Sequence, residues 1–120
     1  MARKIDADTK IKLKVIVEAI EEKQGNDLIS LDLSGIESAV TDYFVVTNAD
    51  STTQVVAIAH EIEKATSKVL KEKVWKKEGY ENSQWVLLDY GSIVVHVFQT
   101  PYREFYKLEE LWADAKLKKY

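Results

Sequence analysis

Two histidines, a serine and several carboxylates are the residues of this chain that could carry out chemistry. His96 and Asp89 lie on either side of Gly91-Ser92, a two-residue connection that is typical of a tight β-hairpin. In the register set by this loop, His96 lies diagonal to Asp89, within reach of a hydrogen bond. A catalytic triad would also need a nucleophile, and Ser92 lies in the loop without a G-x-S-x-G motif. We therefore expect a polar pair that orients a surface histidine, and no enzyme activity.

Metal and phosphate sites find little support in the sequence. His60, the other histidine, is well separated from His96, and no convincing carboxylate cluster accompanies the two. The four glycines are isolated and form neither G-x-G-x-x-G nor a P-loop. The D-x-D motif of Asp6 and Asp8 lies at the N-terminus. We expect no cofactor and no bound metal.

The hairpin that positions His96 has two different faces, because alternate strand residues point to the same side. The first face is apolar apart from one tyrosine hydroxyl and consists of Val86, Leu88, Tyr90, Ile93, Val95 and Val97. The second face consists of Trp85, Leu87, Asp89, Val94, His96 and Phe98. Because the second face keeps aromatic and polar side chains together, it is a candidate surface for a partner.

Length and composition indicate a single domain over residues 1–120, with 46% hydrophobic and 31% charged residues. The net charge of −3 argues against nucleic-acid binding driven by overall charge. The chain contains no cysteine, which excludes disulfides and thiolate metal sites. No apolar run is long enough to span a membrane, and the charged N-terminus lacks the apolar core of a signal peptide. We expect a cytoplasmic protein.

Apolar periodicity predicts the first half of the fold. Asp8 is the expected cap of a first helix, which Gly25-Asn26 ends. Strands are expected over residues 28–33 and 43–47. Ser51 has the capping-box spacing to Gln54 and opens the clearest helix. Its buried stripe is expected to consist of Val55, Ile58, Ala59, Ile62, Ala65, Val69 and Leu70.

A strand at Val74-Trp75 and the hairpin follow, and Thr100-Pro101 then predicts a last helix towards Trp112. The order α-β-β-α-β-β-β-α predicts an α/β (α+β) fold with one mixed sheet of about five strands. Helices should cover the apolar hairpin face and leave the other face partly open. Lysines 71, 73, 76 and 77 complement the dipole of the second helix, and Trp75 among them keeps RNA contact as a secondary possibility.

Two segments carry a family resemblance: TDYFVVTNADSTTQVVAIA (41–59) and GYENSQWVLLDYGSIVVHVFQTPYREFYKLEELW (79–112). Both resemble the ribosomal silencing factor family, also called RsfS or Iojap, and the resemblance spans roughly residues 8–113. Residues 114–120 are then a C-terminal tail, expected to be solvated. The most distinctive elements are Asp42-Tyr43-Phe44, Ser51 to Gln54, Trp85, Asp89-Tyr90-Gly91, His96-Val97-Phe98, Arg103, Tyr106, Leu108-Glu109 and Leu111-Trp112.

The resemblance implies a nucleotidyltransferase-like topology and a function without catalysis. Members of the family bind the fourteenth protein of the universal large-subunit series, obstruct joining of the small ribosomal subunit and lower translation when nutrients are scarce. A homodimer of the free protein is also implied. The topology leaves a metal-dependent nucleotidyltransferase or nucleotide binder as the alternative, although no D-x-D follows Gly91-Ser92.

The candidate partner-binding residues are Trp85, Asp89, His96, Phe98, Arg103 and Tyr106. Arg103 and Tyr106, three apart on the last helix, are expected to face outward together. In the structural reading, Leu111 and Trp112 pin that helix to the core, and this role is favoured for Trp112.

Two positions depart from the usual family pattern. Asn48 stands where glycine is common, and we expect it to preserve a left-handed turn. Ser92 replaces a common aspartate and should leave the fold unchanged.

Overall fold

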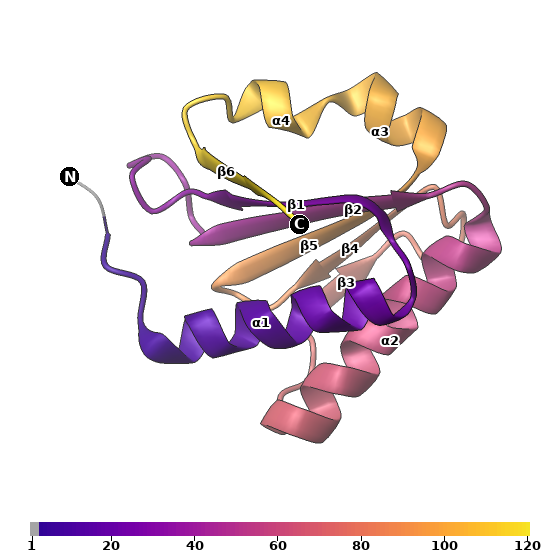
Figure 1. Cartoon of the computed structure of the whole chain (residues 1–120), viewed down its shortest axis with the longest axis horizontal. Coiled ribbons are helices and arrows are strands. Elements are labelled where there is room, and N and C mark those ends of the chain that lie inside the picture. Colours follow the sequence, from indigo (N-terminus) through magenta and orange to yellow (C-terminus); the bar gives the residue numbers. More distant parts are fainter. Residues whose placement is uncertain (1–2) are drawn as a thin grey trace.

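A six-stranded mixed sheet is the centre of the computed structural model, which describes residues 3–120 (Figure 1). In chain order the elements are α1 (Ala7–Glu22), β1 (Asn26–Asp32), β2 (Tyr43–Ala49), α2 (Thr52–Leu70), β3 (Lys76–Glu78), β4 (Trp85–Asp89), β5 (Ile93–Gln99), α3 (Thr100–Tyr106), α4 (Leu108–Leu111) and β6 (Lys116–Lys119). The strands lie in the order β3-β4-β5-β2-β1-β6, with β2 and β5 parallel and the other neighbours antiparallel. The predicted α-β-β-α-β-β-β-α order is confirmed, and α4 and β6 extend it. The third strand is formed by Lys76–Glu78 and not by Val74-Trp75 as predicted.

The predicted hairpin register is confirmed. Val86 pairs with Val97 and Leu88 with Val95, and all four side chains are fully buried. Helices α1 and α2 lie on this face of the sheet (Figure 1). The main core is therefore the apolar hairpin face packed against the buried sides of these two helices.

Helix α2 begins as predicted, because the Ser51 hydroxyl accepts a hydrogen bond from the Gln54 N–H at 3.1 Å. Its predicted buried stripe holds as far as Ile62, whereas Val69 is exposed in the last turn, just before Lys71 turns the chain away in the left-handed conformation. Helix α1 is capped by Asp6 and not by Asp8, because the Asp6 carboxylate accepts from the Thr9 N–H at 2.8 Å.

The end of α1 also differs from the expectation. The helix ends at Glu22, and the left-handed residue is Gln24, with a φ of 58°. Gly25 is needed there for a different reason: a Cβ atom would lie 2.6 Å from the Ile20 side chain and 2.6 Å from the Thr47 hydroxyl. A glycine is therefore required by the close approach of the chain to the core.

The second face of the sheet is covered in part by α3 and α4, which lie opposite α1 and α2 (Figure 1). The predicted single helix is interrupted at Lys107, with a φ of 50°, and its N-cap is Gln99 and not Thr100. Leu108 is buried in the small core of this face, whereas Leu111 is exposed. The expectation that Leu111 pins the helix is therefore wrong, because the break at Lys107 turns Leu108 inward instead.

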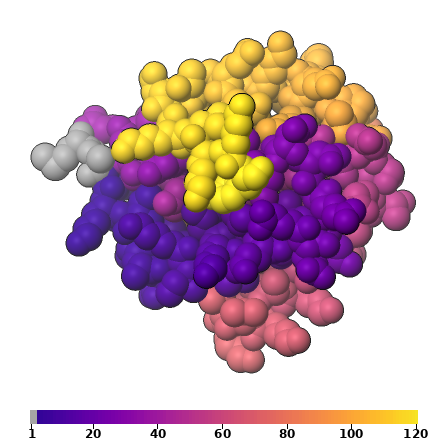
Figure 2. All heavy atoms as spheres, in the orientation of Figure 1, coloured from indigo at the N-terminus to yellow at the C-terminus, as the bar shows by residue number. Residues whose placement is uncertain are grey.

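The C-terminal residues form a strand and not a solvated tail. Strand β6 pairs with β1, and the Tyr120 hydroxyl lies 3.0 Å from that of Ser30. Figure 2 shows this yellow segment lying against the molecule beside the orange atoms of α3. The backbone groups on the outer edge of β1 gain partners in this way, which makes the sixth strand favourable despite its exposed side chains.

Candidate functional site

Three of the predicted partner-binding residues form one aromatic stack. Trp85 of β4 pairs with Phe98 of β5, and their ring centroids are 4.8 Å apart at an interplanar angle of 29°. Tyr106 of α3 contacts the same indole, with ring centroids 4.7 Å apart. Phe98 is fully buried, Trp85 is half-buried and Tyr106 is 44% exposed. The stack therefore joins the sheet to α3 and presents its outer ring to solvent.

His96 is buried beside this stack and is not a surface histidine. Its Nδ1 accepts a hydrogen bond from the Trp85 Nε1–H at 3.1 Å, and the Phe44 ring lies edge-on at a centroid distance of 4.6 Å. Asp89 makes no bond to it, because the Asp89 carboxylate accepts from the Gly91 N–H at 2.7 Å and so closes the hairpin loop. The prediction that Asp89 and His96 form a hydrogen-bonded pair is therefore wrong.

Burial lowers the pKa of His96 to about 4, so the imidazole is neutral at neutral pH. Because Nδ1 is the acceptor for Trp85, the single ring proton belongs on Nε2. Among the described residues, His96 Nε2 is the buried side-chain atom without a hydrogen-bond partner. A buried donor without a hydrogen-bond partner is costly to the fold.

His96 also lines an apolar cavity of about 340 Å³ on this face of the sheet. Leu87 and Val94 come from the hairpin, Phe44 from β2, and Trp112 follows α4. Trp112 packs edge-to-face on Phe44, at a centroid distance of 5.7 Å, which agrees with its expected role in holding the C-terminal segment. The cavity is large enough to take an apolar side chain.

Arg103 points towards the sheet and not outward with Tyr106. Its Nη1 donates to the Asp27 carbonyl oxygen at 2.6 Å and to the Asn48 side-chain oxygen at 2.8 Å. Its Nε lies 3.4 Å from Glu109. The side chain is 12% exposed. The expectation of an outward-facing Arg103 is wrong, because the ends of β1 and β2 offer acceptors to its guanidinium.

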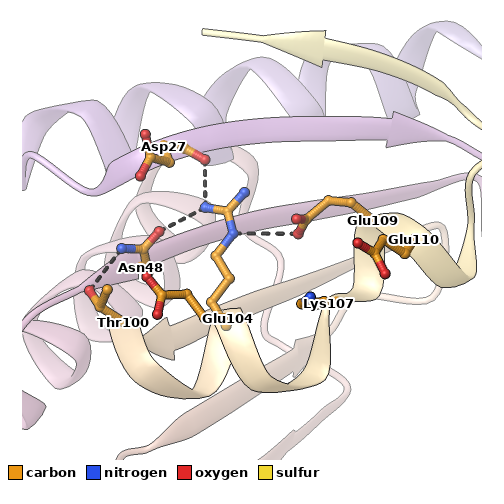
Figure 3. A pocket seen from close by; sticks show the side chains of 8 residues that line it. Asp27, Asn48, Thr100, Glu104, Lys107, Glu109 and Glu110 are labelled. Carbon is orange, nitrogen blue, oxygen red and sulfur yellow. Dashed lines mark hydrogen bonds and ion pairs between the residues drawn. The ribbon is translucent and has the colours of Figure 1, made fainter.

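Asn48 does not occupy a left-handed turn. It lies in the extended strand β2, is buried, and pairs with Phe98 across the parallel ladder. Its Nδ2 donates to the Thr100 hydroxyl at 2.9 Å (Figure 3). That hydroxyl in turn donates to the Asp50 carboxylate at 2.8 Å. A glycine at position 48 could not form these bonds. The departure at Asn48 therefore adds a bridge between the sheet and α3 that the sequence did not predict.

An acidic hollow of about 390 Å³ surrounds this bridge (Figure 3). Glu104, Glu109 and Glu110 line it together with Asp27, whereas Lys107 is the cation beside Arg103. The same two short helices expose large apolar side chains. Phe105 is 77% exposed and was not singled out from the sequence. Leu111 is 73% exposed, and the break at Lys107 accounts for its exposure.

The described residues contain no group of three or more His, Asp or Glu side chains placed to hold a metal ion. None of the helices in the described range is long and apolar enough to cross a membrane. The site consists of an aromatic stack, an apolar cavity and exposed apolar side chains beside an acidic hollow. Such a surface can bind a partner but offers no obvious nucleophile.

Comparisons with known proteins identify the family of this chain. Residues 6–119 match the family model described as "Ribosomal silencing factor during starvation". The ribosomal silencing factor RsfS of Bacillus subtilis is 43% identical over 106 residues, which cover 88% of this chain and 87% of that protein. The mouse protein named "Mitochondrial assembly of ribosomal large subunit protein 1" is 30% identical over 105 residues, 86% of this chain and 46% of the mouse protein.

A crystal structure of a Chromobacterium violaceum protein has the same fold. The two chains superpose with a TM-score of 0.82 at 34% sequence identity, over 87% of this chain and 85% of the other. The family model and the relatives agree over nearly the whole chain, and the family is one of regulatory proteins and not of known enzymes. The chain belongs to the ribosomal silencing factor family, RsfS.

Proposed function

We propose that this protein is a non-enzymatic anti-association factor that acts in the cytoplasm. It binds the large ribosomal subunit through the fourteenth protein of the universal series, blocks joining of the small subunit and lowers translation when nutrients are limiting. Membership of the RsfS family supports this proposal, and the mouse relative is named for assembly of the ribosomal large subunit.

The observation that carries the proposal is the apolar cavity beside the exposed aromatic edge of the second face. His96, Leu87 and Val94 line this cavity. Phe105 and Tyr106 extend the apolar surface along α3. A protein interface typically has such a centre of aromatic and apolar side chains with a polar rim.

The rim indicates the charge of the partner. Glu104, Glu109 and Glu110 lie beside the apolar side chains of α3 and α4, and the charge of Arg103 is offset by Glu109. An acidic rim of this kind favours approach to a basic protein surface and disfavours approach to bare phosphate groups. We therefore place the docking contact on ribosomal protein and not primarily on RNA.

The structure divides the candidate partner-binding residues into two groups. Trp85 and Tyr106 reach solvent and can contact a partner directly, and Asp89 stands at the rim of the cavity. Phe98, Arg103 and His96 support these residues from within the fold.

Sedimentation of purified ribosomal subunits through sucrose gradients tests the proposal. The protein in excess should sediment with large subunits and reduce the peak of assembled ribosomes. Phe105→Ala should weaken both effects without changing the melting temperature, because its side chain lies in solvent. Val69→Ala, which removes an exposed apolar side chain from α2, is the matched control and should behave like the parent. If the parent protein neither sediments with large subunits nor reduces the assembled peak, the proposal is wrong.

We also infer that the free protein forms a homodimer through the same second face. Phe105, Tyr106 and Leu111 are all exposed on two adjacent short helices, and apolar patches of this kind usually find a partner. Analytical ultracentrifugation should show a dimer whose population rises with concentration and falls in Phe105→Ala. A strict monomer at high micromolar concentration would contradict this inference.

The nucleotidyltransferase alternative gains no specific support from the geometry. The Ser92 hydroxyl accepts from Lys12 Nζ at 3.3 Å, and Lys12 also pairs with Glu72 at 2.7 Å. Titration calorimetry with nucleoside triphosphates and magnesium separates the two functions, since micromolar binding would favour the enzyme.

A further inference from the structure

A basic hollow lies at the edge of the sheet formed by β3, on the side of α2, and an exposed tryptophan follows one of its lining residues in the chain. The hollow measures about 440 Å³ and is lined by Lys64, Lys73 and Lys77, with Ser67, Glu63 and Val74. Trp75 follows Val74 directly and is 77% exposed. Helix α2 lies across the sheet from α3 and α4 (Figure 1), so this surface is separate from the proposed docking surface.

The sheet fixes the position of Trp75. Its backbone N–H donates to the Asp89 carbonyl oxygen at 2.9 Å, and the next residue, Lys76, pairs with Asp89 in the ladder between β3 and β4. Trp85 and Trp112, by contrast, are both partly buried against aromatic neighbours. The Trp75 indole thus stands on a fixed backbone with most of its surface in solvent, and it contributes little to the core.

The hollow carries a net positive charge. Its one acid, Glu63, is already engaged, because it accepts from Lys77 Nζ at 3.2 Å and from the Tyr80 hydroxyl at 2.5 Å. Within the described residues, Lys64 and Lys73 have no ion-pair partner and both are exposed. Two lysines are therefore free to neutralise an anion that enters the hollow.

A simpler reading accounts for the lysines but not for Trp75. Cations near a helix C-terminus complement the helix dipole, and lysines on an edge strand discourage pairing with another chain. Neither effect needs a large aromatic ring in solvent at the same place. Lysines around a hollow beside an exposed aromatic ring are the parts of a single-stranded nucleic-acid site, where phosphates contact the cations and a base stacks on the ring.

We propose that this surface binds an unpaired segment of RNA, with a phosphate near Lys64, Lys73 and Lys77 and a base stacked on Trp75. Unpaired bases are required, because only a splayed base offers its flat face to an indole. The choice of RNA rests on the proposed ribosomal function, but the binding itself does not depend on the docking surface. The overall charge of −3 limits the attraction to this local cluster, so moderate and strongly salt-dependent affinity is expected.

Fluorescence anisotropy with a short, unstructured, dye-labelled RNA tests the proposal in the absence of ribosomes. Trp75→Ala should weaken binding by about fivefold or more, whereas Trp75→Phe, which keeps a stacking ring, should retain most of the affinity. Lys73→Glu should weaken binding and flatten the slope of log affinity against log salt by roughly 0.7. Lys119→Glu makes the same charge change in β6, at the opposite edge of the sheet, and should leave affinity unchanged.

Three results would overturn the proposal. The parent protein could fail to bind the RNA even at low salt, Trp75→Ala could bind as well as the parent, or Lys119→Glu could weaken binding as much as Lys73→Glu. Vesicles containing phosphatidylserine provide a further arm, and preference for vesicles over RNA would assign the surface to a membrane instead. Because this assay contains no ribosomes, its failure leaves the sedimentation test of the docking surface unaffected.

Discussion

Replacing Arg103 by alanine should destabilise the fold strongly, although arginine is a common surface residue. The substitution removes the donor to the Asp27 carbonyl oxygen and to the Asn48 side-chain oxygen. Hydrogen bonds to charged groups each contribute about 1.5–3 kcal/mol, and a buried acceptor left without a partner costs about 1–3 kcal/mol. Asn48 is buried, and part of the loss at Asp27 is recovered from solvent. We therefore expect the free energy of unfolding to fall by about 3 kcal/mol.

Urea denaturation followed by tryptophan fluorescence and circular dichroism measures this change, provided that the two transitions coincide. Glu104→Ala is the matched control, because Glu104 lines the same hollow but is exposed, and it should change stability by less than about 0.5 kcal/mol. A double-mutant cycle with Asn48→Ala should give a coupling of about 1–3 kcal/mol. If Arg103→Ala unfolds within about 0.5 kcal/mol of the parent, the inward-facing role assigned to Arg103 is wrong.

Three further predictions concern the second face. Trp112→Ala should lower the free energy of unfolding by about 2 kcal/mol in the same denaturation assay, less than for a fully buried ring, because Trp112 is only half-buried against Phe44. Asn48→Gly should destabilise the protein through loss of its bonds to Thr100 and Arg103, and a stability equal to the parent would contradict the bridge. Burial lowers the pKa of His96 from 6.5 to about 4, so the unfolded chain binds the proton more tightly. The stability that neutral His96 contributes should be complete above about pH 6.5 and fall towards pH 4, and His96→Phe should remove this pH dependence from denaturation curves.

The sheet and its main core could be predicted because their determinants are local. Gly91-Ser92 set the hairpin register, and alternation then placed Val86 and Leu88 in the core. The spacing of Ser51 to Gln54 likewise identified the start of α2. Such patterns involve only residues that are close in the sequence, so they can be recognised without knowing which distant residues are in contact.

The C-terminal third was predicted less well because long-range contacts decide it. The break at Lys107 is a left-handed residue that is neither glycine nor asparagine, so no composition signal marks it. Strand β6 follows from the unpaired edge of β1, about ninety residues away, and its lysine-rich sequence resembles a solvated tail. The hydrogen bond between Arg103 and Asp27 joins residues that are 76 positions apart, and the periodicity of apolar residues does not predict it.

The same contrast explains why the sequence predicted which candidate residues lie close together but not what each of them contacts. Trp85, Phe98 and Tyr106 were correctly placed near one another, since strand alternation and a short helix after β5 bring them together. The roles of His96 and Arg103 depend on which atoms find partners, and that is a property of three-dimensional packing. Sequence patterns indicated the surface, whereas only coordinates could separate residues that reach solvent from residues that hold them in place.

This separation matters for reading any binding experiment on the second face. Arg103 and Asn48 join the ends of β1 and β2 to α3, the helix that exposes Phe105 and Tyr106. Arg103→Ala is therefore expected to lose ribosome binding in proportion to the fraction of protein that is unfolded. Cooling should restore part of the folded fraction and, with it, part of the binding. Phe105→Ala should lose binding at parental stability, at every temperature. Comparing the two variants across temperature thus distinguishes a residue that contacts the partner from one that positions the contact. If Arg103→Ala fails to bind even where it is fully folded, Arg103 or its charge takes part in docking directly.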